Sequence, residues 1–174
     1  GFYCYQREIK IGGKKLALRQ TTGYPFEGDT EIEVTRATGS DFALRIRIPG
    51  WVRNQPVPSD LYRYADGKQS GYTVKINGEI VENEVNDGYM TLARRWRKGD
   101  KVTVHFDMQP RVVKAHPNVV ADKGRIAVER GPLVYCAEWK DNDFDVLSVL
   151  MNREPKFEIG QRVEELYNAL CLHT

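Results

Sequence analysis

Apolar and polar side chains alternate along most of this chain, and a period of two is the pattern of a half-buried β-strand. Residues 42–48 give the clearest case, because four apolar side chains share one face while Arg45 and Arg47 lie on the other. Pro49 follows, and since proline cannot donate a ladder hydrogen bond, we expect the strand to end there. The same pattern predicts further strands at residues 8–11, 14–19, 31–35, 72–76, 79–82, 88–93, 101–106, 111–114, 124–129 and 133–139.

Turn-forming residues separate these predicted strands. Gly12 with Gly13 forms one such pair, and Asn77 with Gly78 forms another. Both pairs adopt the positive φ angles of a two-residue hairpin turn at little steric cost, so each predicts a β-hairpin. Residues 54–71 are mostly polar and contain two prolines, which predicts a long loop.

Many short strands with closely spaced turns indicate an all-β protein built as an antiparallel β-sandwich. Residues 163–172 are the one segment whose pattern suggests a helix. Pro110 marks a natural seam, so we expect a complete β-sandwich domain at 1–110 and the start of a second β-rich domain at 111–174. Three or four strands are few for an independent sandwich. The second unit is therefore expected to be truncated or to pack on a partner surface.

Composition and charge exclude several classes of protein. The chain has 174 residues, of which 41% are apolar, and its net charge is only +2, which is too small to gather nucleic acid. No apolar run approaches the roughly 18 residues of a membrane-spanning helix. The first residues lack the plan of a signal peptide. Periplasmic, secreted and cytoplasmic locations all remain open.

The three cysteines do not form a metal-binding or redox motif. Cys4, Cys136 and Cys171 are too scattered for zinc-ligand or CxxC spacing. An odd number also argues against a complete disulfide framework. We therefore interpret them as thiols that behave as small hydrophobic residues, and we predict no metal or cofactor on this chain.

Paired carboxylates and histidines were considered as candidate catalytic groups. Ordinary glycoside hydrolysis needs two carboxylates, and Glu31 with Glu33 and Glu82 with Glu84 occur at two-residue spacing. In a strand, that spacing places both on the solvent face, so a structural role is favoured. His116 precedes a proline, and a loop-orienting or interdomain contact is the favoured role. No catalytic residue is predicted.

Aromatic residues offer a candidate carbohydrate or interdomain surface. Trp51, Tyr62 and Tyr64 have faces suited to the CH faces of sugar rings, although core packing explains them equally well. Trp96 lies in a basic cluster at residues 94–98, where packing of the ring beside a solvated turn is favoured over nucleic-acid stacking. The candidate contacts are thus Trp51, Tyr62, Tyr64, Trp96 and His116.

A set of short motifs occurs in one order along the chain, and as a set it resembles the C-terminal β-sandwich region of glycoside hydrolase family 127, the β-L-arabinofuranosidases. The resemblance covers the chain from about Arg7 onward, and each motif is weak without the others. The motifs are Leu-Arg-Gln-Thr-Thr-Gly-Tyr-Pro at 18–25, Leu-Arg-Ile-Arg-Ile-Pro-Gly-Trp at 44–51, Val-Lys-Ile-Asn-Gly at 74–78, Trp-Arg-Lys-Gly-Asp at 96–100, His-Pro at 116–117 and Arg-Gly-Pro-Leu-Val-Tyr at 130–135.

The resemblance implies where catalysis would take place. Proteins of this family place their active site in an upstream (α/α) barrel, in which a zinc-bound cysteine is the nucleophile, supported by further cysteine and glutamate ligands. Metal coordination supplies the reactive thiolate. The family's adjacent cysteine pair is absent from this chain, so the resemblance carries over no catalytic or metal residue.

Three functions are compatible with these observations. The first is a non-catalytic accessory region of an arabinofuranosidase-like glycosidase, whose partners would be the catalytic barrel of the same protein or a second copy in a homodimer. The second is a carbohydrate-binding module for arabinose-containing plant glycans. The third is an immunoglobulin-like structural or adhesion module, for which a broad exposed apolar patch would be the distinguishing sign. A nucleic-acid or membrane partner is not expected.

Overall fold

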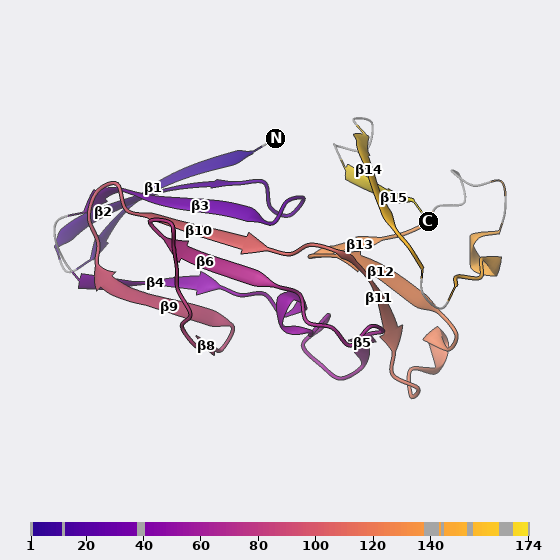
Figure 1. The fold of residues 1–174 in the computed structure, drawn as a ribbon. Helices are drawn as coiled ribbons and strands as arrows, with labels where there is room; N and C mark the ends of the chain where they lie inside the picture. Colours follow the sequence, from indigo (N-terminus) through magenta and orange to yellow (C-terminus); the bar gives the residue numbers. More distant parts are fainter. Residues whose placement is uncertain are drawn as a thin grey trace.

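The computed structural model describes residues 2–11, 13–37, 41–137, 143, 145–152, 155–163 and 169–173, and most of them lie in β-strands (Figure 1). All strand pairings among these residues are antiparallel, which confirms the predicted all-β class and the antiparallel sandwich. No bilayer-spanning helix occurs in the part of the chain that the structure describes. The strands are β1 (Tyr3–Ile11), β2 (Lys14–Thr22), β3 (Asp29–Ala37), β4 (Asp41–Arg47), β5 (Tyr62–Tyr64), β6 (Tyr72–Ile76), β7 (Glu79–Ile80), β8 (Val85–Asn86), β9 (Tyr89–Arg95), β10 (Lys101–Phe106), β11 (Pro110–Ala115), β12 (Ile126–Arg130), β13 (Leu133–Tyr135), β14 (Glu158–Val163) and β15 (Ala169–His173).

Two sheets enclose the main hydrophobic core. A six-stranded sheet has the order β1–β2–β3–β10–β6–β7, and a three-stranded sheet of order β4–β9–β8 forms the facing layer (Figure 1). The predicted alternation of residues 42–48 places Ile46 and Ile48 in this core, where they are 7% and 0% exposed. The largest fully buried side chains are Trp96, Ile48, Met90, Leu92, Val34, Val52, Val74 and Val102.

The hairpin predicted at Asn77 and Gly78 is present. Both residues have positive φ angles, 53° for Asn77 and 90° for Gly78, and Ile76 pairs with Glu79 across the turn. Positive φ at both central positions defines the hairpin turn whose twist matches its strands. The turn thereby joins β6 to β7 at one edge of the six-stranded sheet.

Residues 54–71 do not form a continuous loop, and this prediction was wrong in part. They contain β5, which pairs with β11 through Val113 opposite Tyr64 and Ala115 opposite Tyr62. A three-residue strand is too short for its alternation to stand out in the sequence. β5 is the edge strand of a second sheet of order β13–β12–β11–β5. A strand from residues 1–110 therefore belongs to a sheet whose other strands lie at residues 110–135. The division at residue 110 itself stays a prediction.

The helix predicted at residues 163–172 is wrong for its described part. Val163 ends β14, and Ala169–His173 forms β15, which pairs with β14 in a two-stranded sheet. Residues 164–168 lie outside the described residues. A short apolar run has no periodicity that separates a helix from a strand, which explains the error. The strand predicted at 133–139 is observed as β13, and its last two residues also lie outside the described part.

Candidate functional site

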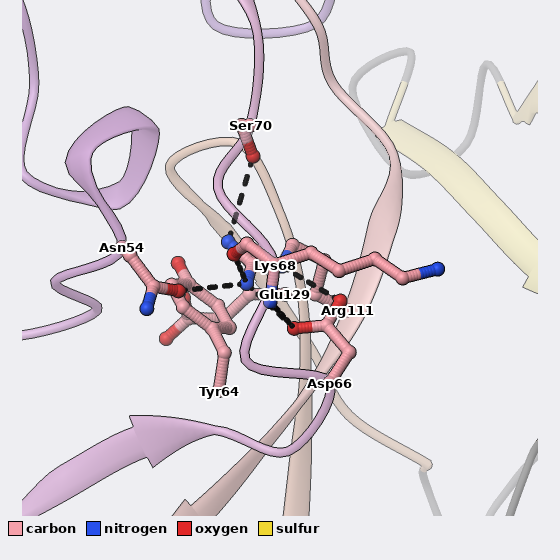
Figure 2. Close-up of polar contacts among 7 residues, drawn as sticks. All are labelled: Asn54, Tyr64, Asp66, Lys68, Ser70, Arg111 and Glu129. Carbon is pink, nitrogen blue, oxygen red and sulfur yellow. Dashed lines mark hydrogen bonds and ion pairs between the residues drawn. The ribbon is translucent and has the colours of Figure 1, made fainter.

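The most concentrated polar cluster in the described residues surrounds Arg111, near the start of β11 (Figure 2). The Arg111 side chain is only 7% exposed. Its Nη2 lies 2.6 Å from Asp66 Oδ1 and its Nε lies 3.2 Å from Asp66 Oδ2, so the two side chains form a bidentate ion pair. Such a pair is stronger and more directional than a single-point contact.

The segment 54–70, which lies between β4 and β6 in the sequence, supplies the remaining partners of Arg111. Asn54 ends the short 3₁₀ turn Trp51–Arg53 in a left-handed conformation with φ 63°, and its Oδ1 accepts a 2.9 Å hydrogen bond from Arg111 Nη2. Arg111 also donates to the Lys68 carbonyl oxygen and, at 3.5 Å, to Ser70 Oγ. Arg111 therefore fixes residues 54–70 against the second sheet. We call this set of residues the Arg111 cluster.

Tyr64 and Glu129 complete the Arg111 cluster from neighbouring strands (Figure 2). Arg111 pairs directly with Glu129 across the β11–β12 ladder, and Tyr64 pairs with Val113, so all four residues lie on one face of the sheet. The guanidinium carbon of Arg111 lies 3.5 Å from the centre of the Tyr64 ring, a cation–π contact. The Tyr64 hydroxyl donates a 2.8 Å hydrogen bond to Glu129 Oε2.

Burial and hydrogen bonding raise the pKa values of two groups in this cluster and lower that of a third. Burial raises the pKa of Glu129 above its usual value, and the Tyr64 hydroxyl and the Arg111 charge only partly compensate. Burial and the hydrogen bond to Glu129 raise the pKa of Tyr64. Burial also opposes ionisation of Asp66, but hydrogen bonds from Arg111 and from the Lys68 N–H outweigh it, so the pKa of Asp66 is lowered.

These shifts predict opposite pH responses for two conservative variants. The raised pKa of Glu129 means that its contribution to stability is complete below its usual value of 4.5 and is lost as the pH rises through the folded-state value. Glu129→Gln should therefore gain stability relative to the parent at neutral pH, and the gain should disappear in acid. Asp66 contributes above its usual value of 3.8, and this contribution is lost as the pH falls through its lowered folded-state value.

Asp66→Asn should accordingly be less stable than the parent at neutral pH, by a deficit that shrinks in acid. Urea denaturation of the parent and both variants at about pH 3, 5 and 7 measures the three profiles. Stability differences that do not change with pH would contradict the assigned shifts.

The five residues selected from the sequence are divided between the core and the second sheet. Trp96 is 0% exposed, stacks on Phe42 with ring centres 5.8 Å apart, and donates its Nε1–H to the Phe42 carbonyl oxygen at 3.1 Å. Trp51 is 8% exposed and packs edge-to-face on Phe106 at 5.7 Å. Core packing, the favoured role for Trp96, is therefore the one observed, and neither indole presents a free face for stacking on a sugar.

Tyr62, Tyr64 and His116 lie together at the second sheet. Tyr64 is 5% exposed and belongs to the Arg111 cluster. Tyr62 is half-buried, and its hydroxyl donates a 2.8 Å hydrogen bond to Asp122 Oδ2. His116 is exposed, and its backbone N–H donates to the Leu61 carbonyl oxygen at 2.7 Å. A carbohydrate or interdomain role for these residues stays a prediction.

Arg111, Asp66 and Asn54 were not among the candidate residues predicted from the sequence. One signal was present: Arg111 shares its strand phase with Val113, so a charged residue occupies a position on the buried face. A charge in such a position predicts a partner, because burying an unpaired charge is costly. The sequence does not reveal which partner, since Asp66 lies 45 residues earlier.

A second candidate site is a groove of about 690 Å³ on the outer face of the six-stranded sheet. It lies on the strand phase opposite the core and carries hydroxyl groups together with both signs of charge. Asp29 Oδ1 lies 2.8 Å from His105 Nδ1, which is a hydrogen-bonding distance, and Glu31 Oε1 lies 3.0 Å from Lys101 Nζ, so polar side-chain contacts cross between β3 and β10 here. The groove is lined by Phe2, Thr21, Asp29, Thr30, Glu31, Thr73, Lys75, Thr103, Val104 and His105.

The described residues do not offer a zinc site. Among them, no group of three or more His, Cys, Asp and Glu side chains is placed to hold a metal ion. Cys4 and Cys136 are exposed free thiols, and Cys171 lies in β15. The family resemblance places its zinc ion in the upstream barrel, and that expectation stays a prediction.

Comparison with known proteins identifies the family. The family model described as the GH127 middle domain of beta-L-arabinofuranosidase matches residues 3–108, which is more than half of the chain. The chain belongs to glycoside hydrolase family 127. A second family model, the glycoside hydrolase family 127 C-terminal domain, matches residues 110–166.

Relatives within family 127 are much longer than this chain. A non-reducing end beta-L-arabinofuranosidase of Bifidobacterium longum is 32% identical over 134 residues, which cover 75% of this chain and 18% of the relative. A solved GH127 beta-arabinofuranosidase has a TM-score of 0.92 and 51% identity, and covers 97% of this chain and 26% of its own. A GH127 beta-L-arabinofuranosidase from Geobacillus stearothermophilus has a TM-score of 0.82 and 31% identity, covering 96% and 24%. The chain thus spans about a quarter or less of these relatives.

Proposed function

We propose that this chain is a non-catalytic accessory region of a family 127 glycoside hydrolase, where it braces the catalytic (α/α) barrel or a dimer. One observation carries the proposal: the two matching family models are described as a middle domain and a C-terminal domain, and together they span residues 3–166 with a single residue between them. The match covers only 18%, 26% and 24% of the three relatives, so most of their length belongs to other regions.

The chemistry of the Arg111 cluster supports a structural role. An ordinary two-carboxylate glycosidase needs one carboxyl group free to protonate the leaving oxygen and a second one free to act as base or nucleophile, whereas the family resemblance implies a zinc-bound cysteine as the nucleophile. Here Asp66 accepts hydrogen bonds from Arg111, and Glu129 accepts one from Tyr64, so both carboxyl groups hold parts of the fold together. Perturbed pKa values arise in structural ion-pair networks as well as in active sites.

The proposal is tested by assaying the purified chain on an aryl β-L-arabinofuranoside, with a complete GH127 beta-arabinofuranosidase as the positive control. We expect no turnover above the uncatalysed rate from the chain by itself. Turnover by the purified chain that is abolished by Glu129→Gln would overturn the proposal and would identify the Arg111 cluster as an active site.

The outer groove supports a second candidate function, carbohydrate binding. Threonine hydroxyls, balanced charges and the exposed Phe2 ring suit a neutral, polyhydroxylated ligand with apolar CH faces. This site replaces the tryptophans as the candidate binding surface, because Trp51 and Trp96 are buried.

Calorimetric titration with arabinan and arabinogalactan tests the second function. If it is correct, Thr73→Val with Thr103→Val should weaken binding roughly tenfold, since two hydroxyl contacts are lost. Thr91→Val is the matched control, because Thr91 is an exposed threonine on β9, in the other sheet. Flat titrations with both glycans would rule out this function.

A further inference from the structure

The edge strand β1 carries an apolar strip on the face that elsewhere forms the core. Its register pairs Ile9 with Leu16 and Tyr5 with Gln20, and residues paired directly across a ladder point to the same face. On the next strand, Gln20 pairs with Ile32 and Leu18 with Val34. Tyr3, Tyr5 and Ile9 therefore continue the core-facing side of the six-stranded sheet outward to its edge.

The facing sheet does not cover this strip. Leu16 and Val34 are buried at 4% and 0% exposure. By contrast, Tyr3, Tyr5 and Ile9 are 46%, 59% and 43% exposed, and the core contains no described residue of β1. β1 is the edge strand of the six-stranded sheet (Figure 1), so the apolar face of the sheet extends beyond the layer that buries it.

The opposite face of β1 carries mainly polar and charged side chains, as is usual for a surface exposed to solvent. Glu8 forms ion pairs with Lys15 at 3.5 Å and with Arg36 at 3.6 Å, and Gln6 and Lys10 lie on the same phase. β1 therefore has one polar and one apolar face, as a half-buried strand does, but in this structure both faces are exposed to solvent. An amphipathic strand whose apolar side lacks a cover marks a surface for another protein segment.

We propose that Tyr3, Tyr5 and Ile9, with Arg7 between them, form the surface on which the catalytic portion of a family 127 glycoside hydrolase docks. We call these four residues the β1 strip. The inference rests on the proposed accessory function and adds the contact surface to it. The match covers 97% and 96% of this chain but only 26% and 24% of the two solved relatives, so those proteins contain a large additional region that can cover the strip.

The composition of the β1 strip fits a protein partner better than a glycan. Tyrosine and arginine are enriched at protein interfaces, because each combines a large contact area with hydrogen-bonding groups. Ile9 offers no polar contact to a sugar. The expected partner surface is apolar at its centre and supplies acceptor groups to the two tyrosine hydroxyls and to the Arg7 guanidinium.

The test uses a chimera in which this chain replaces the equivalent quarter of the 51% identical GH127 beta-arabinofuranosidase. Hydroxyl-radical labelling of Tyr3 and Tyr5 is compared in the chimera and in the isolated chain. We expect labelling of both tyrosines to fall roughly fivefold in the chimera, as half-exposed side chains become part of an interface core. Equal labelling in the two proteins would overturn the docking surface.

Variants separate docking from the folding of the sandwich itself. Tyr3→Ser with Tyr5→Ser and Ile9→Ser should lower the unfolding midpoint of the chimera but leave that of the isolated chain nearly unchanged. The matched control, Cys4→Ser with Gln6→Ser and Lys10→Ser, alters the opposite face of the same strand and should leave both midpoints in place. Equal losses in the two proteins would show that the β1 strip acts only within the sandwich, contrary to the inference.

The outcomes distinguish this inference from the proposed function. A chimera that hydrolyses arabinofuranoside while Tyr3 and Tyr5 remain fully labelled would leave the accessory function intact and eliminate the β1 strip. Turnover by the isolated chain would instead eliminate the accessory function. Protection of the tyrosines that grows with the concentration of the isolated chain would assign the strip to self-association and overturn docking of the catalytic portion.

Discussion

Replacing Trp96 with alanine is expected to lower the free energy of unfolding of this chain by about 3–5 kcal/mol, the usual cost of deleting a large buried aromatic side chain. The indole is 0% exposed and stacks on Phe42, so its removal leaves a cavity between the two sheets of the main sandwich. The Phe42 carbonyl oxygen also loses the hydrogen bond donated by the indole N–H. Equilibrium urea denaturation followed by circular dichroism measures the loss.

Two further variants define the origin of this effect. Trp96→Phe should cost less, because the phenyl ring retains part of the stacking and lacks only the N–H and some of the volume. Arg95→Ala is the matched control, since Arg95 is the exposed neighbour at the end of β9. A loss below about 1 kcal/mol for Trp96→Ala would contradict the structural role of the indole. It would return Trp96 to the candidate surface residues.

Local patterns in the sequence were sufficient for the main sandwich. The alternation in residues 42–48 predicted a strand with one buried face, and Ile46 and Ile48 are buried as expected. Asn77 and Gly78 predicted a hairpin because their backbone angles are set by two adjacent residues. Features that depend on a few neighbouring residues are thus readable from the sequence, because the information that determines them is local.

Features that depend on distant partners were not readable. Tyr64 has the same aromatic character as a surface stacking residue, and its burial follows only from the pairing of β5 with β11. The exposure of Tyr3 and Tyr5 likewise follows from where the facing sheet ends rather than from their own strand. The same holds for β15, whose partner β14 precedes it, and whose apolar run by itself fits a helix equally well.

The Arg111 cluster combines a local signal with distant partners, and it links the main sandwich to the sheet of β5, β11, β12 and β13. Arg111 connects Asn54, Asp66 and Ser70, which lie between β4 and β6 of the main sandwich, to the sheet of β5, β11, β12 and β13. The proposed accessory function would require the chain to hold its own parts in a fixed arrangement. We therefore expect this cluster to contribute more to the rigidity of the region than its few residues suggest.

Arg111→Met is expected to destabilise the chain by about 2–4 kcal/mol, because removing one partner of a buried ion pair leaves the other without compensation. The lower part of this range reflects Asp66, whose side chain is 36% exposed and regains some hydration. Methionine keeps much of the arginine side-chain volume, so the loss reports the polar contacts and the cation–π contact with Tyr64. Urea denaturation measures the loss, and hydrogen exchange of residues 54–70 measures the accompanying release of that segment.

The control is Lys114→Met, which makes the same kind of change on the exposed, opposite face of β11 and should alter stability by less than about 0.5 kcal/mol. Arg111→Lys should recover only part of the loss, since an ammonium group cannot form the bidentate contact with Asp66. In Arg111→Met with Asp66→Asn, the two losses should be less than additive, because the partner's charge is removed together with its cation. Strictly additive losses of unfolding free energy, or unchanged hydrogen exchange in residues 54–70, would contradict this role of Arg111. Either result would mean that apolar packing holds the main sandwich and the second sheet together.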